Sequence, residues 1–109
     1  WYLIAEINGD AIGFAVYFYN FSTFAGRPGL YIEVLYVKED FRKIGIGFRI
    51  LCCLSDTAIK NDCSFMEWSV LKWNERSIDF YKKLGAEQKD EWFYYKLDID
   101  NLKKLSSKY

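Results

Sequence analysis

The chain has 109 residues, and its fifteen basic and fifteen acidic side chains give a formal net charge of zero. This length fits one domain, and the balanced charge supplies no positive field for a nucleic-acid backbone. No apolar run is long enough to span a membrane, and the lack of histidine excludes histidine metal sites. We therefore expect no nucleic acid, membrane or metal partner, and acid–base chemistry falls to Glu, Asp, Tyr, Cys or Lys.

The cysteines indicate the cellular environment, and the aromatic residues indicate the kind of core. Cys52, Cys53 and Cys63 are odd in number, show no C-x-x-C spacing and accompany no signal-peptide pattern, which favours a reduced, cytoplasmic protein with buried thiols. Aromatic residues make up 20% of the chain, which predicts a thick core together with exposed rings that line a cleft.

The first half of the chain predicts three strands. Residues 1–7 and 12–19 are rich in Ile, Tyr, Phe and Val, and Asn8-Gly9-Asp10 between them is a strong hairpin signal. Because residues 13–19 are almost all apolar, we expect this second strand to be covered on both faces. Residues 20–29 predict a loop, and residues 30–37 a third strand.

A helix and a fourth strand are expected next. Between residues 45 and 60 the apolar positions recur every four residues, at Ile46, Ile50, Leu54 and Ala58, and Leu51 and Cys53 broaden this stripe. Residues 65–71 predict a further strand. A strand, a helix and a strand in succession favour a right-handed crossover, which makes the two strands parallel neighbours.

The last third of the chain predicts a second helix, a strand and a tail. Asn74 is a good helix N-cap, helical spacing relates Ile78, Tyr81 and Leu84, and Gly85 suits the C-terminal left-handed position. Residues 92–97 predict a final strand. Residues 98–109 are a polar tail with one weak helix around Leu102 and Leu105.

The junction after the third strand predicts an anion site. Residues 42–47, Arg-Lys-Ile-Gly-Ile-Gly, open the first helix, and a helix start presents unpaired N–H groups and the positive end of the helix dipole. A third glycine at the dinucleotide-binding spacing is missing, and no Gly-Lys-Ser/Thr follows as in a P-loop. Phosphate is the expected ligand, because glycines let the backbone approach it closely and Arg42 adds positive charge.

Two stretches resemble the GNAT family of N-acetyltransferases. The first is Arg42 followed by Gly45 and Gly47, and the second is residues 73–86, WNERSIDFYKKLGA, which fill the key positions of the later family motif. The resemblance implies an α/β (α+β) fold with a mixed, mostly antiparallel twisted sheet, a splayed parallel pair and packed helices. Residues 1–109 would form one such domain, without the family's first strand and first two helices.

The same resemblance implies acetyl-coenzyme A (acetyl-CoA) as the co-substrate. Its pyrophosphate would lie at the helix start, its pantetheine arm would pair with the backbone of the third strand, and further contacts would come from the second helix. The cofactor-binding residues would be Leu35, Tyr36, Val37, Arg42, Lys43, Ile44, Gly45, Ile46, Gly47, Asn74, Ser77 and Tyr81.

Two catalytic residues follow from the resemblance. Tyr81 would protonate the departing thiolate, and a phenol of pKa about 10 is only modestly mismatched with a thiol of pKa about 8.5. Glu33 would help to deprotonate the attacking amine, because an alkylammonium is almost fully protonated at neutral pH. The alternatives are that Tyr81 is a core aromatic residue and that Glu33 points to solvent.

Within the family, the chain is most similar to the diamine acetyltransferases, the spermidine/spermine group and its thialysine-acetylating relatives. Glu91 and Trp92 stand where that group binds its cationic substrate, and a carboxylate beside an indole suits an ammonium. An exposed hairpin tip is the alternative. Val34 stands where relatives have Asp, and Lys43 where Gly is common.

The leading hypothesis is an N-acetyltransferase that transfers acetyl from acetyl-CoA to a primary amine of a polyamine, diamine or lysine analogue by direct attack. Cys52, Cys53 and Cys63 would take no part. One alternative is a catalytically impaired acyl-CoA binding module, and another is a structural fragment completed by a partner. Because residues 1–7 would form an exposed aromatic edge strand, a homodimer is expected.

Overall fold

The computed structural model describes residues 1–22 and 26–108. The chain divides into two compact units, residues 1–71 and residues 72–109. In the described part of the chain, no helix combines the length and the apolar character needed to cross a membrane.

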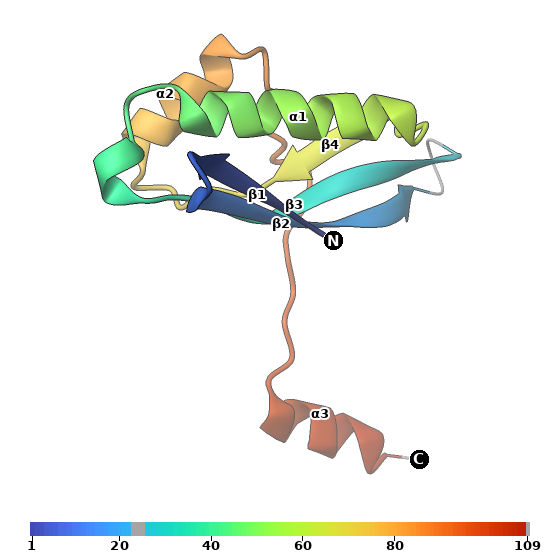
Figure 1. Ribbon diagram of the computed structural model, residues 1–109. Helices are drawn as coiled ribbons and strands as arrows, with labels where there is room; N and C mark the ends of the chain where they lie inside the picture. Colours follow the sequence, from blue (N-terminus) through green and yellow to red (C-terminus); the bar gives the residue numbers. More distant parts are fainter. Residues whose placement is uncertain (23–25, 109) are drawn as a thin grey trace. The chain divides into compact units, whose positions relative to one another are not determined.

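Residues 1–71 form a twisted four-stranded sheet with one long helix (Figure 1). The strands β1 (Tyr2–Ile7), β2 (Asp10–Ser22), β3 (Arg27–Val37) and β4 (Phe65–Trp68) are neighbours in that order. The first three pair antiparallel, whereas β3 and β4 pair parallel. The predicted fold class, a mostly antiparallel mixed sheet with one parallel pair, is therefore confirmed.

The hairpin between β1 and β2 is also as predicted. Asn8 and Gly9 have positive φ angles of 53° and 86° between the paired residues Ile7 and Asp10, as a tight two-residue turn requires. By contrast, the predicted loop at residues 20–29 is wrong at both ends, because Asn20 pairs with Gly29 and the strands extend to Ser22 and from Arg27. The centre of that predicted loop, residues 23–25, lies outside the described residues.

Helix α1 (Ile46–Lys60) packs along one face of the sheet (Figure 1). Its buried residues are Ile50, Leu51, Leu54 and Ala58, which confirms most of the predicted stripe. Cys52 and Cys53 are exposed, so their predicted burial is wrong. The reason is geometric, because each residue turns the helix by about 100° and these two positions fall off the face that the buried four share.

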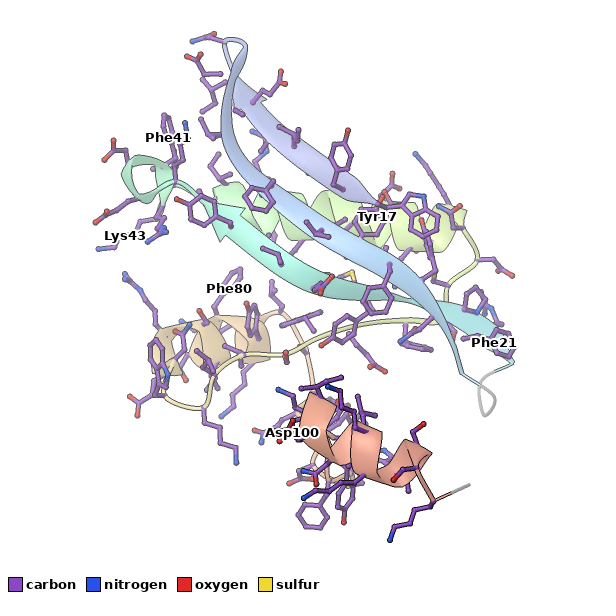
Figure 2. The ribbon with its side chains drawn as sticks, turned by 90° about the horizontal axis from the view of Figure 1, so that it is seen from below. Tyr17, Phe21, Phe41, Lys43, Phe80 and Asp100 are labelled. Atoms are coloured by element: carbon purple, nitrogen blue, oxygen red, sulfur yellow. The ribbon has the colours of Figure 1, made fainter. Side chains whose placement is uncertain are left out.

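Within residues 1–71 no described helix covers the opposite face of the sheet, so the expectation that β2 is covered on both faces is wrong. Ala15 and Tyr17 are buried on the α1 side, whereas Phe14 and Phe18 remain 38% and 40% exposed. Figure 2 views the sheet from the side opposite α1. Within the described residues of 1–71, α1 is the only α-helix, and it lies on the other face.

Strand β4 is shorter than the predicted strand over residues 65–71, and this shortness shapes the sheet. It pairs with β3 from Gly29 to Ile32 and ends at Trp68. The following residues of β3, from Glu33 to Val37, pair only with β2 among the described strands. The parallel pair is therefore splayed, and β3 has one free edge over its second half.

Residues 72–109 contain two short helices, α2 (Glu75–Lys83) and α3 (Ile99–Ser106). Asn74 caps α2 and Gly85 follows it with a φ of 91°, as predicted. The predicted strand at residues 92–97 is wrong, since this segment has no regular structure and Phe93, Tyr94 and Tyr95 are at least 90% exposed. A strand needs a neighbour for its backbone hydrogen bonds, and no described strand pairs with it.

Candidate active site

The free edge of β3 presents backbone groups rather than side chains. Lys38 N donates to Ile12 O at 2.8 Å, and Tyr36 lies opposite Phe14. Backbone bonds alternate along an antiparallel strand, so the N–H and C=O groups of Leu35 and Val37 point away from β2. This edge suits an extended ligand that carries amide groups.

Glu33 lies where the free edge begins, on a β-bulge. The register between β2 and β3 shifts there, because Val16 opposes Val34 whereas Tyr17 opposes Ile32. Bulges re-aim side chains and are frequent beside functional sites. The Glu33 side chain is exposed, as the alternative that it points to solvent expects. Its candidacy depends on its position at the start of the free edge.

Arg42 is held against the end of β3. Its Nε donates to Val37 O at 2.8 Å, and the guanidinium carbon lies 5.6 Å from the centre of the Tyr36 ring. A guanidinium has five N–H donors, and this bond uses one of them. The bond orients the cation between the free edge of β3 and the start of α1.

The loop between β3 and α1 contains two residues in the left-handed region. After the short 3₁₀ helix η1 (Glu39–Phe41), Lys43 has a φ of 70° and Gly45 a φ of 86°. Figure 2 shows Phe41 and Lys43 on this loop at the end of β3. The left-handed region costs a non-glycine residue about 1 kcal/mol, so Lys43 is strained at this position.

The N-terminus of α1 is open to a ligand. Gly45 is its N-cap, no side chain bonds the cap, and the first turn has no acidic residue. The first backbone N–H groups of a helix have no intrahelical partner. A Cβ built on Gly47 meets nothing within 4 Å, so the fold itself does not require glycine there. Ile44, on the same loop, is 62% exposed.

The second unit holds the other predicted cofactor and catalytic residues on α2. Asn74 Oδ1 accepts from Ser77 N at 3.3 Å, and Ser77 and Tyr81 are one helical turn apart on the same side. Tyr81 is half-buried, and burial raises the pKa of its phenol above the ordinary value of 10.0. The phenol therefore keeps its proton at neutral pH.

Glu91 and Trp92 lie between α2 and α3 in a segment without helix or strand. Both side chains are exposed, and Trp92 is 69% exposed. The structure thus groups the predicted site residues in two sets. Residues 33–47 gather at the end of β3, and Asn74, Ser77 and Tyr81 lie together on α2.

Comparison with known proteins identifies the family of the chain. The chain belongs to the acetyltransferase (GNAT) family, whose family model matches residues 1–86. It is 34% identical over 100 residues to a thialysine N-epsilon-acetyltransferase of Bos taurus, covering 89% of this chain and 58% of that protein. It is 38% identical over 96 residues to a tyramine N-feruloyltransferase 4/11 of Nicotiana tabacum, covering 88% of this chain and 42% of that protein.

A solved structure supports the fold. An integron cassette protein from the mobile metagenome of V. cholerae superposes with a TM-score of 0.87 at 28% identity, covering 96% of this chain and 65% of that chain. The present chain thus spans about half the length of the curated relatives and about two thirds of this structure.

Three features of the site did not emerge from the sequence. The bond from Arg42 to Val37 and the bulge at Glu33 depend on tertiary geometry, and no local residue pattern signals them. The third is the contact between Tyr31 Oη on β3 and Ser69 Oγ, just after β4, which are 3.5 Å apart. A signal did exist for the strained φ of Lys43, because the resemblance to the GNAT family places Lys43 where glycine is expected.

Proposed function

We propose that the chain is an acyl-CoA-dependent N-acetyltransferase, which transfers acetyl from acetyl-CoA to a primary amine of a small molecule. One observation carries this proposal. The free edge of β3 leads through the Val37–Arg42 bond to the uncapped start of α1. A ligand with amides at one end and phosphates at the other would meet matching backbone groups along this path.

In this proposal the pantetheine amides pair with the backbone of residues 35–37, and the pyrophosphate meets residues 42–47. Gly45 and Gly47 leave room for close approach, and Arg42 and Lys43 supply positive charge. Asn74, Ser77 and Tyr81 add contacts from α2. Residues 1–109 then act as one domain, in agreement with a family match that continues through both units to residue 86.

The proposed reaction is direct attack of the amine nitrogen on the thioester carbon. Glu33 takes a proton from the ammonium, and Tyr81 gives a proton to the departing thiolate. Tyr81 is protonated at working pH, as a general acid must be, although the burial that raises its pKa also makes it a weaker acid. Cys52, Cys53 and Cys63 have no part in the transfer, so Cys→Ala variants keep turnover within a few-fold.

For the acceptor we propose a polyamine, diamine or lysine analogue. Glu33, Glu91 and Trp92 supply carboxylates and an indole face for cationic groups. The similarity to a thialysine N-epsilon-acetyltransferase supports a lysine-like amine. A cytoplasmic setting fits both the acetyl donor and the three free thiols.

Calorimetric titration of acetyl-CoA tests this function, with Arg42→Glu beside the parent and Lys104→Glu as the charge-reversal control on α3. We expect micromolar binding by the parent and the control, and at least a tenfold loss in Arg42→Glu. Mass spectrometry then detects acetylated product with 1,4-diaminobutane or a lysine analogue.

The alternatives give different outcomes in the same experiment. Binding without turnover would identify a catalytically impaired acyl-CoA binding module. A folded parent that binds no acetyl-CoA would contradict the proposed function and favour a structural domain completed by a partner.

We also propose that the chain forms a homodimer through β1. This strand is the outer strand of the sheet beside β2, and Trp1 and Tyr2 are 69% and 73% exposed. An exposed aromatic edge strand favours pairing with another strand. Sedimentation should therefore show a dimer at micromolar concentration, and a monomer would contradict this proposal.

A further inference from the structure

The open face of the sheet carries three rows of paired side chains. Phe14 lies opposite Tyr36, Val16 opposite Val34, and Phe18 opposite Tyr31. Residues directly opposite each other share a face, and the exposure of Phe14 and Phe18 identifies it as the face away from α1 (Figure 2). This face therefore offers an apolar, aromatic surface next to Glu33.

Tyr31 is the best-positioned ring on this face. It lies 5.1 Å from the Phe18 ring between centroids, and its hydroxyl lies 3.5 Å from Ser69 Oγ. The ring thus packs beside Phe18 of β2, and its hydroxyl lies near the chain after β4. An aromatic ring in this position can receive a cation on its π face.

Two carboxylates flank Tyr31. Glu67 is its direct partner in the parallel register with β4, so both lie on the open face. Glu33 is two residues further along β3. From strand spacing and rise, the Cα atoms of Glu33 and Glu67 are about 8 Å apart, a span that two flexible carboxylates and one short diamine can bridge.

The charge on this surface has one sign. Across residues 13–21, 28–36 and 65–69, the charged residues are Glu33 and Glu67. Arg27 lies at the start of β3 and is paired with Asp62 at 2.7 Å, whereas Arg42 lies beyond the other end. A ligand with an apolar middle and two positive ends would match this arrangement.

We propose that Glu67 and Tyr31 bind the second cationic group of a diamine whose reacting amine lies at Glu33. This inference depends on the proposed acetyltransferase function and adds its distal specificity site. The alkyl chain of the diamine then lies along the aromatic rows, and the distal ammonium meets the Tyr31 ring and the Glu67 carboxylate. A monoamine of the same length lacks this second contact.

The test is a calorimetric titration of 1,4-diaminobutane and of butylamine into the chain. Coenzyme A is added first to saturation, which avoids turnover, and its own binding is recorded. Glu67→Gln removes one charge, and Glu6→Gln is the matched control on β1. We expect Glu67→Gln to weaken diamine binding about tenfold and to leave butylamine binding unchanged, while Glu6→Gln behaves as the parent.

Two variants at Tyr31 distinguish the contribution of its ring from that of its hydroxyl. Tyr31→Phe keeps the π face and should bind the diamine within threefold of the parent, whereas Tyr31→Leu should lose about fivefold. Thermal unfolding of each variant checks that the sheet is intact.

Equal diamine affinity in the parent and Glu67→Gln would overturn the inference. So would equal binding of the two amines by the parent, or binding of neither. Both amines are titrated whether or not coenzyme A binds, so failure of the cofactor site and failure of the distal amine site are recorded separately.

Discussion

The two halves of β3 share one strand and one partner, β2, yet they have opposite environments. In the first half, Leu30 and Ile32 are 0% and 4% exposed, and the backbone pairs with β2 and β4. In the second half, Leu35 and Val37, which face the same side of the sheet, are only half-buried, and one edge has no described partner. The end of β4 at Trp68 makes this difference, so the length of a neighbouring strand decides where the fold leaves a place for a ligand.

The largest expected effect compares one substitution in the two halves. Leu30→Ala opens a cavity in the core and should lower the free energy of unfolding by about 3 kcal/mol, whereas half-buried Leu35→Ala should lower it by about 1 kcal/mol. Urea denaturation of both variants measures this difference. Equal losses would show that the second half is as tightly packed as the first.

Glu33 lies at the boundary between the two halves of β3, and a substitution at Glu33 tests its proposed role in catalysis. Glu33→Gln removes the proposed base and should reduce turnover about a hundredfold. Because the side chain is exposed, the free energy of unfolding should change by less than about 0.5 kcal/mol. Steady-state kinetics measure the loss, with Glu39→Gln on η1 as the control, and unchanged turnover in Glu33→Gln would remove Glu33 from the mechanism.

A substitution at Gly47 should raise the stability of the chain and weaken acetyl-CoA binding. Gly47→Ala places a Cβ in open space within a helix, so the chain should become more stable by about 0.5–1 kcal/mol. The same methyl group would meet the pyrophosphate and should weaken acetyl-CoA binding about tenfold. Calorimetry and urea denaturation measure the two effects, and unchanged affinity would place the phosphates elsewhere.

Lys43 gives the smallest expected effect. Lys43→Gly relieves the strain of the positive φ of 70° but raises the conformational entropy of the unfolded chain. The net gain in the free energy of unfolding should therefore be about 0.5 kcal/mol. The loss of one positive charge should weaken acetyl-CoA binding about threefold. Lys43→Ala keeps the strain and loses the charge, so stability that is higher in Ala than in Gly would contradict this account.

Local chemistry predicted much of the fold. The Asn8-Gly9 turn, the apolar stripe of α1 and the cap at Asn74 each depend on residues near in sequence. Predictions failed where a partner decides the outcome. An apolar run such as residues 13–19 does not show which face is covered, and residues 92–97 have strand-forming side chains but no described strand beside them.

The candidate site, like the fold, was predictable from the sequence only where it depends on local residue patterns. The glycines and Arg42 located the helix start, because that pattern is local. The free edge of β3 was not predictable from the residues alone, since it depends on where β4 stops. For the same reason, the cross-strand pairing of Tyr31 with Glu67 could not be predicted from the residues.

The central claim is that the second half of β3 and the start of α1 bind acetyl-CoA. Amide NMR spectra of the labelled chain, recorded during titration with acetyl-CoA, test it most directly. We predict that the amide signals of residues 35, 37 and 42–47 shift strongly, while those of residues 29–32 move little. Strong shifts in residues 29–32 without shifts in residues 35–47, or no shifts in a folded chain, would contradict the claim.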